Sequence, residues 1–236
     1  MSQIRCRLSS VSATVCAVPS RSAASLRFEA LPWRALIDVA APETIAPKPM
    51  MKRTPSYPWV STMSDEGALN LAPFSFFNGV CAKPPTLLFC PTARGSDGAQ
   101  KDTLRNIEAT GEFVVNVVTE ETLLAMNESA GEYPPEVSEF DVAGLTPSPS
   151  VIVKPPRVLE SPVSMECKLN QIIRIGDGGV GSGNVVIGTI VYFHVREDVY
   201  DQGRILTAKL KPVGRLAGAA YCTTTQNVFD LERPAV

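Results

Sequence analysis

The chain has 236 residues, of which 44% are hydrophobic and 19% are charged, and its formal net charge at pH 7 is −2. This composition is typical of a globular protein with a sizeable core, and it excludes a disordered chain, a fibre and a coiled coil. No apolar run approaches the roughly 20 residues that cross a bilayer, and the mildly acidic charge provides no surface for duplex nucleic acid, so we expect neither a membrane nor a nucleic acid as partner.

The N-terminal segment differs in composition from the rest of the chain. Residues 1–28 are rich in serine and arginine and contain no carboxylate, because Glu29 is the first acidic residue. Such a segment is typical of an organellar transit peptide. The alternative, which we favour, is a wrongly assigned start followed by a proline-rich linker. We therefore divide the chain into a poorly ordered extension, residues 1–50, and a folded domain, residues 51–236, and we expect a cytoplasmic location.

From Trp59 onward the sequence has the pattern of short β-strands separated by turns. Asp102 is predicted to cap the first helix, and Gly111 is predicted to end it. Many strands with few helices between them indicate a mainly β protein, an antiparallel, Greek-key-like barrel with helical insertions. The predicted strands are 59–63, one within 71–80, 86–90, 112–118, a half-buried strand over 165–170, 185–195 and a short strand or turn over 213–221. The predicted helices are 102–110, a second that Thr119 caps and that ends near 130, and a short one over 137–140.

The inventory of side chains limits the chemistry. The chain has six cysteines without a C-x-x-C pair, and we expect those of the folded domain to be reduced thiols. Its single histidine, His194, would have to serve any zinc site or catalytic triad, so both are disfavoured and we predict no metal. His194 shares a strand face with Ile190 and Tyr192. It either lies near a cofactor or, as we favour, packs at a barrel rim or subunit interface and hydrogen-bonds to the backbone.

A glycine-rich segment, Gly176–Gly181, matches the pattern G-x-G-x-x-G. A dinucleotide site of that kind needs a helix directly after the glycines. The residues that follow, Asn184–Ile187, are instead β-branched and typical of a strand. We therefore interpret the glycines as a hairpin loop.

Two segments suggest ligand contacts, although each has an ordinary structural explanation. Lys101, Asp102 and Thr103 stand at the start of the first predicted helix, where free N–H groups and a partial positive charge favour a phosphate. A solvated helix cap could have the same residues. The segment Asn70–Asn78 mixes amide and hydroxyl side chains with aromatic ones, and it could line a flat heteroaromatic ligand or form a core strand with local hydrogen bonds.

Together these motifs follow a specific order. They are WVST at Trp59–Thr62, NLAPFSFFN at Asn70–Asn78, KDT at Lys101–Thr103, TGEFVVN at Thr110–Asn116 and PVGRL at Pro212–Leu216. In this order and spacing the chain, over about residues 57–233, resembles the flavin reductase-like family with the FMN-binding split barrel.

The resemblance implies a six-stranded split β-barrel, usually a homodimer, that binds FMN non-covalently near the subunit interface. It implies that Ser61 and Thr62 contact the ribityl chain or phosphate, that the segment from Leu71 to Ser75 lines the ring, and that Lys101 and Thr103 hold the phosphate. No side chain is assigned as acid or base, because the flavin carries the chemistry. The residues assigned to FMN are Ser61, Thr62, Asn70, Leu71, Ala72, Pro73, Phe74, Ser75, Asn78, Cys81, Lys101, Asp102 and Thr103.

Two departures from the family pattern affect the edge of this site. Pro58 follows Ser56 and Tyr57 where the family often has Arg-Pro, and it removes a backbone donor. Cys81 stands where serine is common, so a hydrogen bond to the ring edge is weaker.

The resemblance predicts an NAD(P)H:flavin oxidoreductase with NAD(P)H as co-substrate and a monooxygenase or other redox partner. Two alternatives stay open. One is an FMN-dependent oxidase or electron carrier that serves a partner without direct NAD(P)H turnover. The other is a non-catalytic FMN-binding interaction module.

Overall fold

The computed structural model describes residues 5–6, 36–38 and 57–226, together with 228–229, 231–232 and 234. Most of the predicted N-terminal extension therefore lies outside the described residues. Its described parts are two short parallel strands, β1 (Arg5–Cys6) and β2 (Leu36–Asp38). β2 pairs antiparallel with the end of a long strand of the main sheet.

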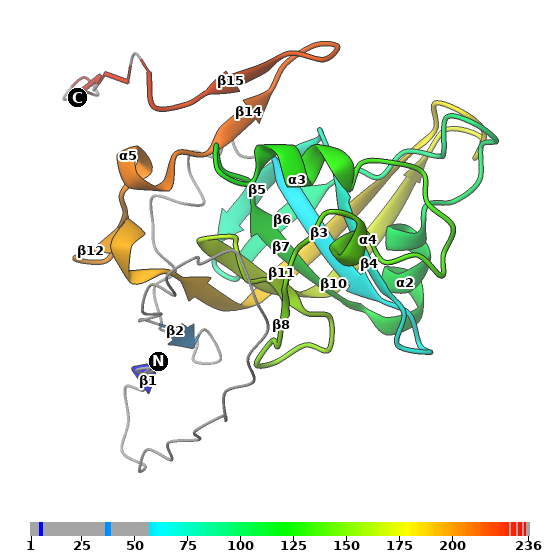
Figure 1. The fold of residues 1–236 in the computed structure, drawn as a ribbon, viewed down its shortest axis with the longest axis horizontal. Coiled ribbons are helices and arrows are strands. Elements are labelled where there is room, and N and C mark those ends of the chain that lie inside the picture. Colours follow the sequence, from blue (N-terminus) through cyan, green and yellow to red (C-terminus); the bar gives the residue numbers. More distant parts are fainter. Residues whose placement is uncertain are drawn as a thin grey trace.

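One antiparallel sheet forms the body of the described chain (Figure 1). Its order is β2-β11-β10-β7-β3-β4, and β11 also pairs with β6, which in turn pairs with β5. All pairs among β2 to β11 in this sheet are antiparallel, so the prediction of a mainly β, antiparallel architecture is confirmed. Its main strands are β3 (Pro58–Met63), β4 (Leu69–Pro73), β5 (Phe77–Ala82), β6 (Pro85–Phe89), β7 (Glu112–Val117), β10 (Val163–Ile175) and β11 (Gly183–Val195).

Short helices and two-stranded pairs connect or flank these strands. None of the helices in the described part of the chain has the length and apolar character that a bilayer crossing requires. The helices are α2 (Asp102–Thr110), α3 (Leu123–Glu128), α4 (Glu139–Val142), the 3-10 helix η1 (Glu197–Val199) and α5 (Thr207–Leu210). The small pairs are β8 (Pro147–Ser148) with β9 (Arg157–Val158), β12 (Tyr200–Asp201) with β13 (Arg204–Ile205), and β14 (Val213–Arg215) with β15 (Tyr221–Thr223).

The first predicted helix has the expected bounds but a different cap. Lys101, with φ −69° and ψ 147°, is the N-cap residue of α2, so the prediction that Asp102 caps the helix is wrong. Asp102 is the first helical residue, and its carboxylate bonds to arginines instead of to the helix backbone. Gly111 ends the helix as predicted, with φ 69°, and its N–H donates to the carbonyl of Ile107.

Four other predictions differ in detail. The strand predicted within 71–80 is split into β4 and β5, because Pro73 cannot donate to a ladder. The second helix begins after Thr122 and not after Thr119, and the third is shifted to α4. The strand predicted as half-buried over 165–170 contains Glu166, which is fully buried because the backbone of residues 151–153 covers it.

Two apolar clusters lie on opposite sides of β3. Side chains of a strand alternate between faces, so Val60 points into the barrel cluster with Phe113 and Phe193, whereas Trp59 joins Leu71 in a second cluster. The second cluster also includes Met126 of α3 and Phe140 of α4. Leu104 and Ile107 of α2 belong to the barrel cluster.

The long strands β10 and β11 form a hairpin that extends past the other strands (Figure 1). The Gly176–Gly181 motif lies in the turn between them, and no helix follows it. The interpretation of these glycines as a hairpin loop is therefore confirmed.

Candidate flavin site

The N-terminus of α2 has free backbone donors. The N–H groups of Leu104 and Arg105 donate to the carbonyl of Lys101 at 3.0 and 3.1 Å. The N–H groups of Asp102 and Thr103 have no backbone acceptor in the described part of the chain, as is usual for the first turn of a helix. These two groups, with the positive end of the helix dipole, can receive an anion.

Three cationic side chains gather around this helix end. The Asp102 carboxylate accepts a hydrogen bond from Arg94 at 2.6 Å and another from Arg105. Lys101 forms no ion pair with any described residue. Because Arg94 and Arg105 both bond to Asp102, Lys101 is the member of these three that is available to a ligand.

Thr103 uses its hydroxyl for an internal bond. The hydroxyl donates to Oδ1 of Asn70 at 2.7 Å, and the side chain is buried. A hydroxyl has one proton, so in this arrangement it is not also a donor to a phosphate. Thr103 can therefore donate to a ligand through its backbone N–H and not through its hydroxyl.

Asn70 is the centre of a buried polar network. Its Oδ1 also accepts from the hydroxyl of Thr62 at 3.2 Å, and Thr62 accepts from Nδ2 of Asn106 at 3.1 Å. Its Nδ2 donates to Oε1 of Glu139 at 2.8 Å. Burial raises the pKa of the Glu139 carboxyl above its ordinary value, and hydrogen bonds from Leu71 and Asn70 offset part of that effect.

Asn106 and Glu139 were not predicted as site residues. Asn106 follows the KDT motif on α2, and its spacing from Asp102 was a signal for it, since residues four apart share a helix face. Glu139 is 69 residues from Asn70 in sequence, and no local pattern indicates such a contact.

Ser61 lies on the other side of β3 from Thr62, because successive strand residues point to opposite faces. It is fully buried, and its hydroxyl donates to the carbonyl of Pro156 at 2.5 Å. Asn116 donates to the Ser61 oxygen at 3.2 Å. The structure therefore does not bring Ser61 together with the α2 terminus.

The four predicted residues from Phe74 onward also lie apart from this group. Phe74 is buried, with its ring centroid 5.1 Å from that of Phe89. Ser75, Asn78 and Cys81 are exposed and form local contacts: Ser75 with the Tyr57 hydroxyl at 3.3 Å, and Cys81 with the Pro84 carbonyl at 3.0 Å.

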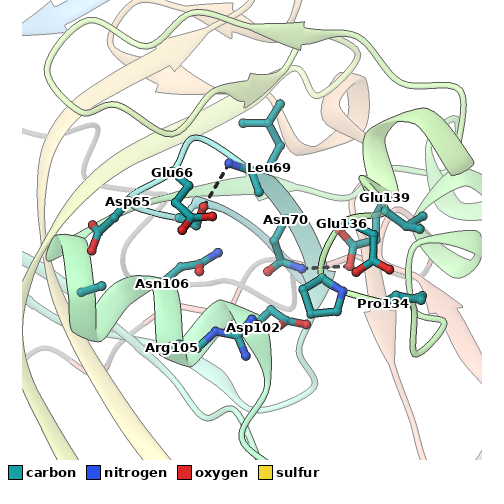
Figure 2. Close-up of a pocket in the computed structure, with 15 residues that line it drawn as sticks. Asp65, Glu66, Leu69, Asn70, Asp102, Arg105, Asn106, Pro134, Glu136 and Glu139 are labelled. Atoms are coloured by element: carbon teal, nitrogen blue, oxygen red, sulfur yellow. Dashed lines mark hydrogen bonds and ion pairs between the residues drawn. The ribbon is translucent and has the colours of Figure 1, made fainter.

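Two cavities adjoin the polar network. The smaller has a volume of about 50 Å³ and is lined by six of the predicted residues: Asn70, Ala72, Pro73, Lys101, Asp102 and Thr103. The larger, of about 490 Å³, lies between the β3–β4 turn, α2 and the segment Pro134–Val137 (Figure 2). Asn70, Asp102 and Glu139 line both cavities.

His194 belongs to a separate buried pair. Its Nε2 lies 2.5 Å from Oε1 of Glu166, and neither residue lines the two cavities. The prediction of a packed histidine is confirmed, but its partner is a carboxylate and not the backbone. Burial lowers the pKa of His194 despite the neighbouring carboxylate. Burial would raise the pKa of Glu166, but hydrogen bonds from His194, Val151 and Ile152 outweigh it and the net shift is downward. Both pKa shifts are consistent with a neutral His194 imidazole that donates a hydrogen bond to an ionised Glu166 carboxylate.

Among the described residues, no group of three or more His, Cys, Asp or Glu side chains could hold a metal ion. An antiparallel barrel, a cationic helix terminus and the adjoining NLAPFS segment, which begins in β4, are together typical of the class of split-barrel flavoproteins. Residues 51–211 match the flavin reductase-like domain family, and the chain belongs to this family. Its chemistry is therefore flavin-related redox chemistry.

Solved structures support this assignment. The chain is 39% identical to nitrilotriacetate monooxygenase component B from Bacillus cereus, with a TM-score of 0.70, covering 75% of this chain and 86% of that one. It is 31% identical to the 2-nitrobenzoate 2-nitroreductase NbaA of Pseudomonas fluorescens, with a TM-score of 0.66 and coverages of 78% and 87%. A protein from Shewanella frigidimarina NCIMB 400, described as a flavin reductase with split barrel domain, is 25% identical, with a TM-score of 0.64 and coverages of 77% and 85%. The expected split-barrel fold is confirmed.

Proposed function

We propose that this protein is an FMN-dependent NAD(P)H:flavin oxidoreductase that takes hydride from NAD(P)H and passes the electrons to an acceptor. The observation that carries the proposal is that one cavity is lined both by Lys101, Asp102 and Thr103 at the start of α2 and by Asn70, Ala72 and Pro73 of β4. The N–H groups of Asp102 and Thr103 have no backbone acceptor among the described residues. This donor set fits a phosphate beside a strand that can line a flat ring.

In this proposal Lys101 and the first turn of α2 hold the FMN phosphate. Both charge and N–H direction favour an anion there. Arg94 is a supporting cation, because its guanidinium already bonds to Asp102 at 2.6 Å. Ser61 and Thr62 contribute through the fold of β3, since both hydroxyls are engaged inside the protein.

The ring would extend from β4 toward the exposed Ser75. Ligand pockets usually measure about 300–1,000 Å³, so a cavity of about 50 Å³ accounts for only part of the flavin site. We propose that a second copy of the chain completes it. Exposed apolar side chains at an edge strand support a homodimer. Phe76, directly before β5, and Val80, within it, are 64% and 50% exposed, and β5 pairs only with β6 in the described sheet.

When bound, FMN supplies the centre that accepts a hydride and releases electrons. The chain itself anchors the phosphate, orients the ring and excludes water from one of its faces. No acid or base is required, in agreement with the absence of the single histidine from the linings of both cavities.

The likeness to nitrilotriacetate monooxygenase component B supports a role as the reductase for a monooxygenase partner. The likeness to a nitroreductase favours a second candidate, direct reduction of a nitroaromatic compound. Both candidates require NAD(P)H to reduce the flavin.

The test is anaerobic rapid mixing of the FMN-loaded protein with NADH or NADPH while absorbance is followed near the flavin band. Bleaching of the flavin band supports the oxidoreductase. If neither nucleotide bleaches the flavin band, the oxidoreductase proposal is contradicted. The remaining functions are then an electron carrier, an oxidase or an FMN-binding interaction module. Failure to take up FMN contradicts all of them.

A further inference from the structure

Glu139 is a buried carboxylate that lies in the lining of the proposed FMN pocket, next to Asn70. It begins α4 and is 6% exposed. Its Oε2 accepts the backbone N–H of Leu71 at 2.9 Å, and its Oε1 accepts Nδ2 of Asn70 at 2.8 Å. Glu139 therefore holds two consecutive residues of the strand that is proposed to line the flavin.

Asn70 extends this connection to α2 and β3. Its Oδ1 accepts the hydroxyls of Thr103 at 2.7 Å and of Thr62 at 3.2 Å. The side chains of all four residues are buried. One carboxylate is thus joined, through a single amide, to the ring-lining strand and to the first turn of the proposed phosphate site (Figure 2 shows the bond between Asn70 and Glu139).

The carboxylate also fixes the direction of every hydrogen bond in the network. An ionised carboxylate only accepts, so Asn70 must turn its NH2 group toward Glu139 and its carbonyl toward α2. The carbonyl then fixes the direction of the Thr103 hydroxyl. A glutamine at position 139 would remove this constraint, because its amide both donates and accepts.

We propose that Glu139 is a positioning residue for FMN: by accepting from Asn70 and Leu71, it locks β4 against the N-terminus of α2 and thereby sets the spacing between ring and phosphate contacts. The inference rests on the proposed function. It assigns to Glu139 no contact with the flavin and no part in proton transfer.

The experiment is a double-mutant cycle on FMN affinity with E139Q, N70D and the double variant E139Q/N70D. E139Q places two amides face to face, and N70D places two carboxylates face to face. The double variant restores one donor–acceptor arrangement. In the double variant, the amide at position 139 can donate to the carboxylate at position 70, and its oxygen can accept from Leu71. The carboxylate at position 70 can also accept from Thr103 and Thr62.

Titration of each apoprotein with FMN, followed by flavin absorbance and fluorescence, gives the Kd and the position of the bound visible bands. We expect each single change to weaken binding on the order of tenfold, and the double variant to recover most of that loss. E136Q is the matched control, because Glu136 lines the larger cavity without a bond to the network. It should leave the Kd unchanged.

Thermal unfolding of the same apoproteins separates positioning from stability. If E139Q lowers the melting temperature but not FMN affinity, Glu139 is structural and the proposal is overturned. Equal losses in E136Q and E139Q would overturn it too, since charge alone would then explain the effect. If E139Q does not fold, recovery of affinity from N70D to the double variant supports the proposal, and no recovery overturns it. A wild-type protein that takes up no FMN contradicts the proposed function instead.

Discussion

Lys101 and Asp102 are neighbours at the start of α2, yet they have different parts in the site. Asp102 is occupied by Arg94 and Arg105, so its charge holds the loop before α2 against the helix. Lys101 has no ion-pair partner among the described residues. The sequence motif identified this helix terminus but could not show this division, because the contact between Arg94 and Asp102 forms only when the loop before α2 folds back onto the helix.

Replacing Lys101 by alanine should weaken FMN binding about tenfold, since a charge-assisted hydrogen bond contributes about 1.5 kcal/mol or more. FMN titration of the apoprotein measures the effect. The matched control is K209A, an exposed lysine of α5, which should bind FMN as the wild type does. Wild-type affinity in K101A would contradict the phosphate assignment.

His194 should make the protein less stable in acid. Because the pKa of His194 in the folded protein lies below the value of 6.5 in the unfolded chain, the unfolded state takes up the proton first and stability falls as pH drops below about 6.5. The lowered pKa of Glu166 adds a further loss below its ordinary 4.5.

The test is urea unfolding at pH 7.5 and pH 5.5. In the wild type, a single histidine with a lowered pKa reduces the free energy of unfolding by at most about 1.4 kcal/mol for each unit by which the pH falls. In H194Q, whose amide can still donate to Glu166, this loss between the two pH values should shrink. If H194Q loses as much stability as the wild type between pH 7.5 and pH 5.5, groups other than His194 cause that loss.

At the scale of elements, strands and helices were predictable where one local pattern dominates. Alternation and β-branched residues located β7 and β11, and Gly111 located the end of α2. The face of Glu166 was not predictable, because the segment that covers it comes from residues 151–153. The same reason explains why Glu139 was missed: its contacts with β4 form only in the folded chain.

Gly188 is a position where two elements meet too closely for any side chain. A Cβ there would lie 2.3 Å from Cζ of Phe113, a fully buried ring of β7. G188A should therefore destabilise the protein by about 1–3 kcal/mol. G183A on the same strand is the control, because a Cβ there meets nothing within 4 Å. Urea unfolding of both variants checks the difference, and equal midpoints would show that the Phe113 ring moves aside at little cost.

At the scale of the molecule, the proposed function needs a flavin site that is larger than the cavity one copy of the chain forms. Six of the predicted residues line only a small cavity: Asn70, Ala72, Pro73, Lys101, Asp102 and Thr103. Ser75, before β5, and Asn78, within it, are exposed instead. The family resemblance predicted both groups as one site. A single chain brings only the first group together, which is what a site shared between two copies would require.

Disrupting the proposed dimer should therefore also weaken FMN binding. V80K places a charge at an exposed apolar position of the edge strand β5, and a lysine at an edge strand opposes pairing. Sedimentation velocity should show a dimer for the wild type and a monomer for V80K, and the FMN affinity should fall with it. I173K, at a partly exposed apolar site on the β10–β11 hairpin, is the control and should stay dimeric. A V80K monomer that binds FMN as tightly as the wild-type dimer would place the whole flavin site within one chain, and the open surface at β5 would then need another explanation.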